Sequence, residues 1–277
     1  VKAWTGLETA RGPLLGALAL LWLAARLASL VAPYAVYATL DMLLLPAVAA
    51  VLLRVLIKAG NKRNIPLICL LLLMAAANLV FHLSVLGIVA VPAVSALYAE
   101  LALILMVVSV ITGRVVPMFT RNVTPGLVIN MPRKFELSLL AVTAVALALW
   151  VFAAPAPVVL VASLAAGVMH AVRLWKWHPQ VTFKRPILWI LHASYAWLPL
   201  GFVLLALAQL GWVVPSLAVH AFAVGVICAL IIGMITRTAP GHAGRPLQPS
   251  PREVVAFAPA MPAAELRVLE HALHPPW

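Results

Sequence analysis

Eight apolar stretches of about 20 residues each dominate this sequence. A helix of that length spans the hydrocarbon core of a bilayer. We expect spans at residues 13–31, 35–57, 65–87, 94–112, 136–154, 157–175, 187–208 and 215–236. Hydrophobic residues make up 65% of the chain and charged residues 9%, against about 45–50% and about 25% in soluble domains. The sequence therefore predicts an all-α polytopic membrane protein, a bundle of about eight transmembrane helices in the lipid bilayer.

The charges of the loops alternate along the chain and predict its orientation. Lys and Arg occur in the loops after the second, fourth and sixth spans and follow the eighth, whereas the other connections carry no charge. Basic loops stay in the cytoplasm, so we expect both ends of the bundle to be cytoplasmic. The same rule accounts for the net charge of +12 without a nucleic-acid partner.

Residues 1–237 are expected to form the transmembrane domain, and residues 238–277 a polar cytoplasmic tail. Pro259 and Pro262 interrupt the apolar part of this tail, and charged residues surround them, which argues against a ninth span. The chain opens at Val1 without Met or a signal peptide, so we expect a fragment of something longer.

Polar residues inside the predicted spans fall into two layers, and each is a functional candidate because polar groups are unfavourable in hydrocarbon. The outer layer contains Arg26, Asp41, Asn78, His82, Glu100 and His220. Arg26 and Asp41 lie at matched depth on consecutive helices, which predicts a structural ion pair. The inner layer contains His170 and His192; Arg173 shares the face of His170, and Tyr195 that of His192.

Three segments carry more specific patterns. The first, residues 113–122, contains Gly113, which we expect to end its helix, and Pro117, which we expect to prevent the helix from continuing. The second, residues 186–201, places His192 and Tyr195 on one helical face. The third begins at residues 220–225 and ends at residues 234–246, with a Gly-His-Ala-Gly-Arg-Pro run at 241–246.

Together these three segments resemble the NnrS family of bacterial inner-membrane proteins, from residues 4–6 through residue 246. The resemblance implies a polytopic protein with haem and copper that is linked to nitric oxide and nitrosative stress in denitrifying and related bacteria. It also implies nitric oxide or an iron-nitrosyl species as the small-molecule ligand.

Neutral imidazole is the expected ligand of haem iron and also suits copper. No Cys-x-x-Cys-His motif occurs, which agrees with a non-covalent haem b. His192 and His220 are the first candidates because they lie in the family-like segments, and their different depths favour two separate centres. His170 with His192, and His82 with His220, form pairs of matched depth. The further candidates are Tyr195 for the cofactor, His242 for metal, and Arg114, Arg237 and Arg245 for haem propionates.

Other readings stay open. Arginines at span ends pair by default with anionic lipid headgroups. Asp41, His82 and Glu100 also suit a proton- or cation-coupled transporter, and a structural subunit would use its buried charges for packing alone. We recognise no nucleophile with its base, phosphate-binding loop or paired-carboxylate site, so the sequence assigns no enzyme class.

Overall fold

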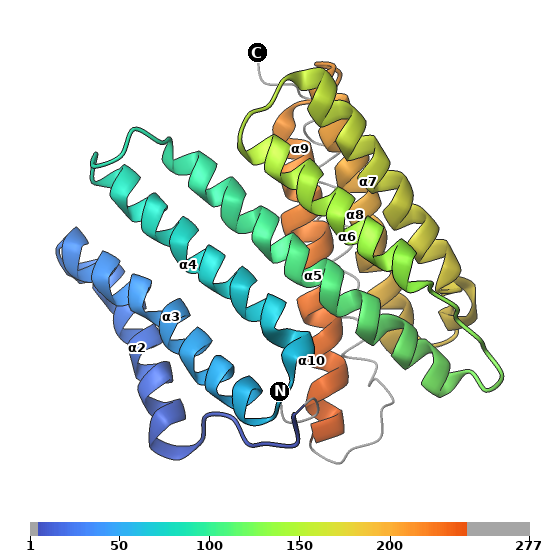
Figure 1. Ribbon diagram of the computed structural model, residues 1–277, viewed down its shortest axis with the longest axis horizontal. Helices are drawn as coiled ribbons and strands as arrows, with labels where there is room; N and C mark the ends of the chain where they lie inside the picture. Colours follow the sequence, from blue (N-terminus) through green and yellow to red (C-terminus); the bar gives the residue numbers. More distant parts are fainter. Residues whose placement is uncertain (1–4, 243–277) are drawn as a thin grey trace. The chain divides into compact units, whose positions relative to one another are not determined.

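The structure, a computed structural model, describes residues 5–242, and for residues 239–242 it describes the backbone alone. The long helices are α2 (Gly12–Val31), α3 (Tyr34–Lys58), α4 (Ile65–Val85), α5 (Ala93–Val123), α6 (Arg133–Val151), α7 (Ala156–Lys176) and α8 (Pro186–Gln209) (Figure 1). The last spanning helix consists of three consecutive segments: α9 (Pro215–His220), the π-helical segment η3 (Ala221–Cys228) and α10 (Ala229–His242). The short turns η1 (Lys62–Asn64) and η2 (Pro179–Thr182) precede α4 and α8.

Eight helical segments of the described residues are long and apolar enough to cross a membrane, one for each predicted span. The predicted all-α polytopic fold is therefore confirmed. Proline stands in the first turn of α2, α4, α7, α8 and α9. The first turn of a helix has no acceptor for its N–H groups, so proline starts a span there without losing a hydrogen bond.

Helix α5 differs from its prediction, because it ends at Val123 and not at residue 112. Gly113 and Pro117 both lie inside it, so the prediction that they end the helix is wrong. Pro117 removes one backbone hydrogen bond, which spanning helices tolerate where neighbouring helices pack against them. Gly113 serves packing, since its missing side chain leaves room for the guanidinium of Arg173.

Helix α10 also runs further than its predicted span, to His242. His242, the candidate metal ligand, is the last residue of this helix. The predicted tail, apart from its first five residues, lies outside the described residues.

The chain divides inside α5 into two compact units, residues 1–107 and 108–277. In unit 1, α2 packs against α3 and α3 against α4. The α2–α3 hairpin is visible in Figure 1. Ala49, Leu56 and Ile68 form a small apolar core between α3 and α4. Most other side chains of α2 and α3 face outward, as expected for helices in lipid.

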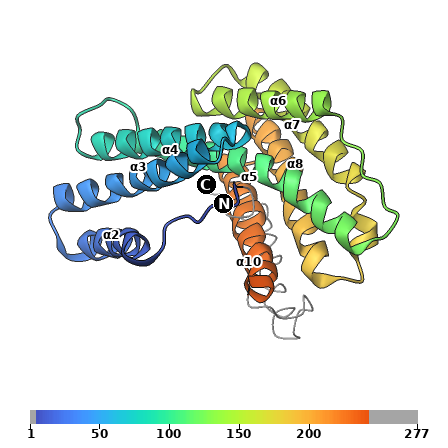
Figure 2. The same ribbon diagram turned by 60° about the horizontal axis from the view of Figure 1, so that its bottom comes forward.

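In unit 2, α8 is the central helix. It packs against α7, α9, η3 and α10. In the most apolar 18-residue stretch of each helix, 67% of the residues of α8 are buried, against 33% for α7 and 22% for α6. Helix α6 packs on α7, as Figure 2 also shows. The residues of unit 2 that carry functional candidates therefore lie on or against its most buried helix.

Candidate functional site

Unit 2 holds a chain of hydrogen bonds between α6, α7 and α8. The hydroxyl oxygen of Tyr195 lies 2.5 Å from Nδ1 of His170, and Nε2 of His170 lies 3.0 Å from the hydroxyl oxygen of Thr143. Arg173 donates from Nη1 to the Tyr195 hydroxyl oxygen over 3.2 Å. All four side chains are buried, so these bonds form in surroundings of low dielectric constant, where hydrogen bonds are stronger than in water.

The hydrogen-bond partners of these four side chains determine which atom carries each proton. The Thr143 hydroxyl donates to the carbonyl of Leu139 over 2.7 Å, so its oxygen accepts from Nε2–H of His170. Nδ1 of His170 then carries the lone pair and accepts the proton of the Tyr195 hydroxyl. The Tyr195 oxygen in turn accepts from Arg173. His170 is thus a neutral imidazole with both ring nitrogens engaged.

Arg173 carries the charge of this cluster. Its guanidinium pairs with Glu136 near the start of α6, through Nη2 and, over 3.1 Å, through Nε. Nη1 also donates to the carbonyl of Ser109 over 2.8 Å, and the guanidinium lies 5.1 Å from the Trp177 ring. The Arg173 side chain is only 1% exposed. A charge so buried is unfavourable unless it is paired and hydrogen-bonded, and Arg173 is both.

His192 is anchored differently. Its Nδ1 lies 3.1 Å from the carbonyl oxygen of Leu188, one turn earlier in α8. A carbonyl only accepts, so Nδ1 carries the proton and Nε2 the lone pair. Nε2 lies 3.4 Å from the hydroxyl oxygen of Thr120, which also donates to the Val116 carbonyl over 3.0 Å. Because the single hydroxyl proton favours the shorter contact, Thr120 is only a weak partner of Nε2. The backbone carbonyl of Trp177 is a further hydrogen-bonding partner of the His192 imidazole.

Trp177 adds an unused donor beside His192. Its side chain is fully buried, and its Nε1–H has no hydrogen-bond partner in the described part of the chain. The ring centroid lies 6.3 Å from that of His192 and 4.5 Å from that of Tyr195. Buried N–H groups without an acceptor are uncommon in native structures. A bound group with an acceptor atom near Trp177 would therefore gain a hydrogen bond.

His220 shares one contact type with His192. Its Nδ1 lies 2.7 Å from the carbonyl oxygen of Ser216, one turn earlier in α9. The side chain is half-buried. The π-helical segment η3 begins at the next residue, and such segments occur frequently at functional sites. Within η3, Gly225 lies so close to Trp197 that a Cβ atom would come within 2.5 Å of its ring.

His192 and His220 lie near opposite ends of α8. His192 is the seventh residue of α8, and His220 ends α9, which follows the other end of α8. At about 1.5 Å per residue, the two imidazoles are about 20 Å apart along the helix direction. One metal ion or haem iron therefore cannot bind both.

In unit 1, both ring nitrogens of His82 have partners. Nδ1 lies 2.9 Å from the hydroxyl oxygen of Tyr34, and Nε2 lies 3.4 Å from Oδ2 of Asp41. Arg26 forms the predicted ion pair with Asp41, and Asn78 donates to the same carboxylate over 3.0 Å. The structure thus brings together four residues of the predicted outer layer. The pairing of His82 with His220 joins different units and stays a prediction.

The residues proposed to bind haem propionates or metal at the ends of the spans differ in burial, and not all of them are described by the structure. Arg237 is buried, with its guanidinium carbon 3.9 Å from the centroid of the Phe119 ring. Arg114 is half-buried on α5. Arg245 lies outside the described residues, and for His242 the structure describes only the backbone. Their roles toward a cofactor stay predictions.

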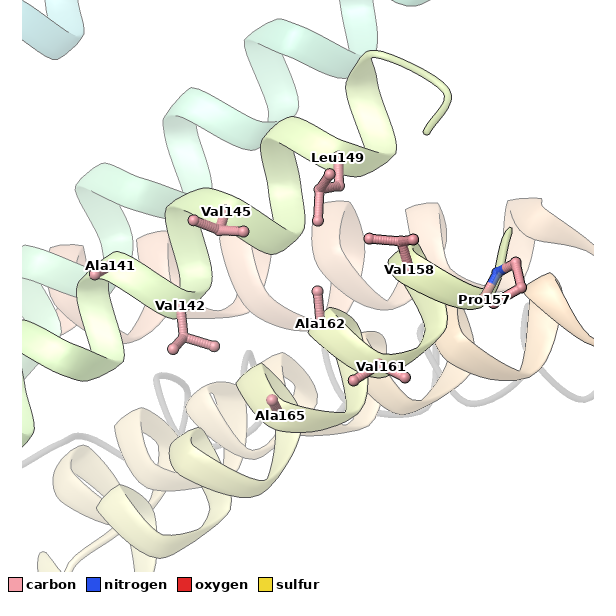
Figure 3. Close-up of a pocket in the computed structure, with 9 residues that line it drawn as sticks. All are labelled: Ala141, Val142, Val145, Leu149, Pro157, Val158, Val161, Ala162 and Ala165. Carbon is pink, nitrogen blue, oxygen red and sulfur yellow. The ribbon is translucent and has the colours of Figure 1, made fainter. Parts of the chain in front are cut away.

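An open groove of about 640 Å³ runs between α6 and α7. Figure 3 shows that hydrocarbon side chains of both helices line it: Ala141, Val142, Val145, Leu149, Pro157, Val158, Val161, Ala162 and Ala165. None of these side chains provides a metal ligand or a hydrogen-bond donor. The groove therefore suits lipid acyl chains and not the polar groups of a cofactor.

The sequence matches a family model along its whole length: the model described as NnrS protein covers residues 1–277. The chain belongs to the NnrS family. Membership identifies this NnrS chain as a nitric-oxide-related membrane protein. No curated protein and no solved structure matches it.

The described histidines of this NnrS chain differ in the hydrogen bonds that a bound metal would have to replace. His192 presents Nε2 while a carbonyl holds its Nδ1–H, which is the arrangement that metal-bound histidines adopt. His170 would have to give up a hydrogen bond of 3.0 Å or less at either ring nitrogen in order to bind. His82 would have to give up the 2.9 Å bond at Nδ1 or the 3.4 Å contact with the Asp41 carboxylate at Nε2. No group of three or more His, Cys, Asp or Glu side chains that could hold a metal ion occurs in the part that the structure describes. That part therefore contains no preformed copper site with several protein ligands.

Sequence reasoning missed Glu136, Thr143 and Trp177. Glu136 stands where a span was predicted to start, and an acidic residue is ordinary in a first turn. Its spacing of seven residues from Thr143 was the available signal, because residues so spaced share one helical face. Trp177 follows a span end, where tryptophan commonly lies at the membrane interface. In the structure it is instead fully buried.

Proposed function

We propose that this chain is a haem-binding membrane protein of the response to nitric oxide and nitrosative stress. Haem b is the proposed cofactor, held without covalent attachment by His192. Its iron would supply the site for nitric oxide or an iron-nitrosyl species. The observation that carries the proposal is the anchoring of His192. The bond from Nδ1–H to the Leu188 carbonyl places the lone pair on the buried Nε2, whose contact with Thr120 is long.

The neighbouring side chains support a ligand role for His192. The Leu188 carbonyl fixes both the tautomer and the ring orientation of the imidazole, which are the two things that a bound metal requires of its ligand. Trp177 offers an N–H donor without a partner next to it. Tyr195 packs against Trp177 and is itself held by Arg173, so the wall beside His192 is stiff.

We extend the proposal to a second centre at His220, because its Nδ1 makes the same type of contact with a backbone carbonyl and it lies about 20 Å from His192 along the helix direction. This centre would hold haem or copper. Copper binding at His192, His220 or His242 rests on the family resemblance, and metal analysis of the purified chain tests it. We also propose that the chain lies in a bacterial inner membrane, on the basis of the family resemblance. Its loop charges support the proposal that both ends of the bundle are cytoplasmic.

The test is haem titration of the purified chain with single His variants. We expect H192A and H220A each to lower the haem content by about one equivalent, or to remove copper in the case of H220A. The matched control is H178N. His178 lies outside the spans at a positive φ of 55°, which asparagine tolerates, so this variant removes an imidazole without straining the backbone. Unchanged haem and metal contents in both H192A and H220A would refute the assignment.

A further inference from the structure

The cluster around His82 in unit 1 has a defined direction of hydrogen bonding. The Asp41 carboxylate only accepts, so Nε2 of His82 carries a proton and donates it to Oδ2 over 3.4 Å. Nδ1 of His82 then carries the lone pair and accepts from the Tyr34 hydroxyl over 2.9 Å. The three side chains form one oriented path, from a hydroxyl through an imidazole to a carboxylate.

The carboxylate at the end of this path is held in place. Arg26 of α2 forms an ion pair with Oδ1 of Asp41, and Asn78 of α4 donates to Oδ2 over 3.0 Å. The Asp41 side chain is 16% exposed, whereas that of Arg26 is 46% exposed. Arg26 can therefore move away from the cluster more easily than Asp41 can.

The His82 imidazole is buried, whereas Tyr34, at the first end of the path, is partly exposed. The His82 side chain is 1% exposed. The rings of Tyr34, Tyr37 and Phe81 surround it, with centroids at 5.7, 5.3 and 5.4 Å. Tyr34 is half-buried and is the first residue of α3, so its hydroxyl lies near an edge of the span. Asp41 lies about 10 Å further along the same helix.

We propose that Tyr34, His82 and Asp41 form a proton-transfer relay that carries a proton from water at the start of α3 to Asp41. In the transfer, the Tyr34 oxygen takes a proton from a hydronium ion, which leaves as water, while the proton of Tyr34 moves to Nδ1 of His82. The proton on Nε2 moves to Oδ2 of Asp41. Two bonds to hydrogen break inside the relay and three form, and the unit gains one proton in total. No electron is transferred, and the relay does not depend on bound haem.

The transfer has a consequence for the α2–α3 ion pair. A protonated Asp41 is neutral, so Arg26 loses the charge that holds it. Two further ionisable groups belong to this region: the Tyr37 phenol on α3, whose ring packs on His82, and Glu100 on α5, which interacts with the backbone of Asn78, one turn from His82 on α4. Oε1 of Glu100 is buried without a hydrogen-bond partner among the described residues. Glu100 is thus the other carboxyl group whose signal an experiment must separate from that of Asp41.

The test is time-resolved infrared spectroscopy of the full chain in lipid nanodiscs after a drop in pH. The expected signal is growth of the C=O stretching band of a carboxylic acid, absent in D41N and retained in E100Q. We expect Y34F and H82Q to slow its growth by roughly 10-fold or more. The final amplitude should not change. Glutamine at position 82 can keep hydrogen bonds to both neighbours, but its amide cannot take up a proton at one atom and release one at another as the two imidazole nitrogens can.

Y37F is the matched control. The Tyr37 ring packs on His82 as closely as that of Tyr34, but its hydroxyl has no part in the path. Y37F should therefore keep the rate of the unsubstituted chain. Equal slowing in Y34F and Y37F, an unchanged rate in Y34F, or the absence of an Asp41 band at any pH where the helices persist would each overturn the proposal. Because Y34F only removes one hydroxyl, the test stands even if H82Q does not fold.

Discussion

Arg173 fills the space that a side chain on Gly113 would need, because its Nη2 atom lies 1.6 Å from the position of a Cβ atom there. Helices α5 and α7 meet at this point, and the guanidinium passes over α5 to reach Glu136 on α6. The glycine in α5 is therefore what allows a buried arginine to join three helices of unit 2.

Substitution of Gly113 by Ala should destabilise the protein by about 3 kcal/mol, because the guanidinium must move and its buried ion pair is broken. The measurement is the free energy of unfolding in mixed micelles, followed by circular dichroism. Gly16, in the interior of α2, has nothing within 4 Å of its Cβ position. G16A is therefore the control, and we expect it to be neutral or slightly stabilising. Equal stabilities for G113A and G16A would contradict the packing described for Arg173.

Substitution of Glu136 by Gln should also destabilise the protein by about 3 kcal/mol, because it leaves the Arg173 charge buried without a counter-charge. The shape of the side chain is kept, so the loss reports charge and not packing. The exposed pair of Glu8 and Arg11 provides the comparison. E8Q should change the free energy of unfolding by less than about 1 kcal/mol. If E136Q were as mild as E8Q, the Arg173 side chain would not be buried as described.

Substitution of Tyr195 by Phe should distinguish His170 from His192 as the haem ligand. It removes the donor to His170 and the acceptor of Arg173, which should cost about 2 kcal/mol of stability. Y195F should keep the Soret band that H192A loses, with at most a small shift, because Tyr195 lies beside the proposed ligand His192 but is not the ligand. A spectrum altered in Y195F as strongly as in H192A would instead assign haem to His170.

The loop charges predict opposite sides for two loops. In intact cells, a membrane-impermeant thiol reagent should label A154C, in the loop between α6 and α7, and should not label K62C, in the loop between α3 and α4. The unsubstituted chain is the control, because its cysteines, Cys69 and Cys228, both lie inside spanning helices. Labelling of K62C from outside, with A154C protected, would reverse the orientation.

Hydropathy and loop charge predicted the number of spans and most of their bounds, because the bilayer demands about 20 apolar residues of any spanning helix. The end of α5 was missed for a physical reason. Gly113 and Pro117 are residues that commonly end helices in soluble proteins. In α5 the glycine instead leaves room for the side chain of Arg173, and only the packed structure shows this contact.

The candidate sites were likewise only partly predictable from the sequence. Matched depth on consecutive helices was enough to predict the pair of Arg26 and Asp41. The partners of His170 come from α6 and α8, and no rule of spacing within one chain segment specifies which helices meet. The sequence therefore supplied the histidines, whereas their tautomers, which separate His192 from His170, required the three-dimensional contacts.

The most direct test of the proposed haem site is imidazole rescue of H192G. The glycine variant leaves a cavity of about the size of the lost ring, so the account predicts a weak or absent Soret band in the purified variant. Added imidazole should restore the band, and added benzene, of similar size but without a basic nitrogen, should not. A Soret band in H192G that equals that of the unsubstituted chain before any addition would contradict the assignment of His192 as the haem ligand.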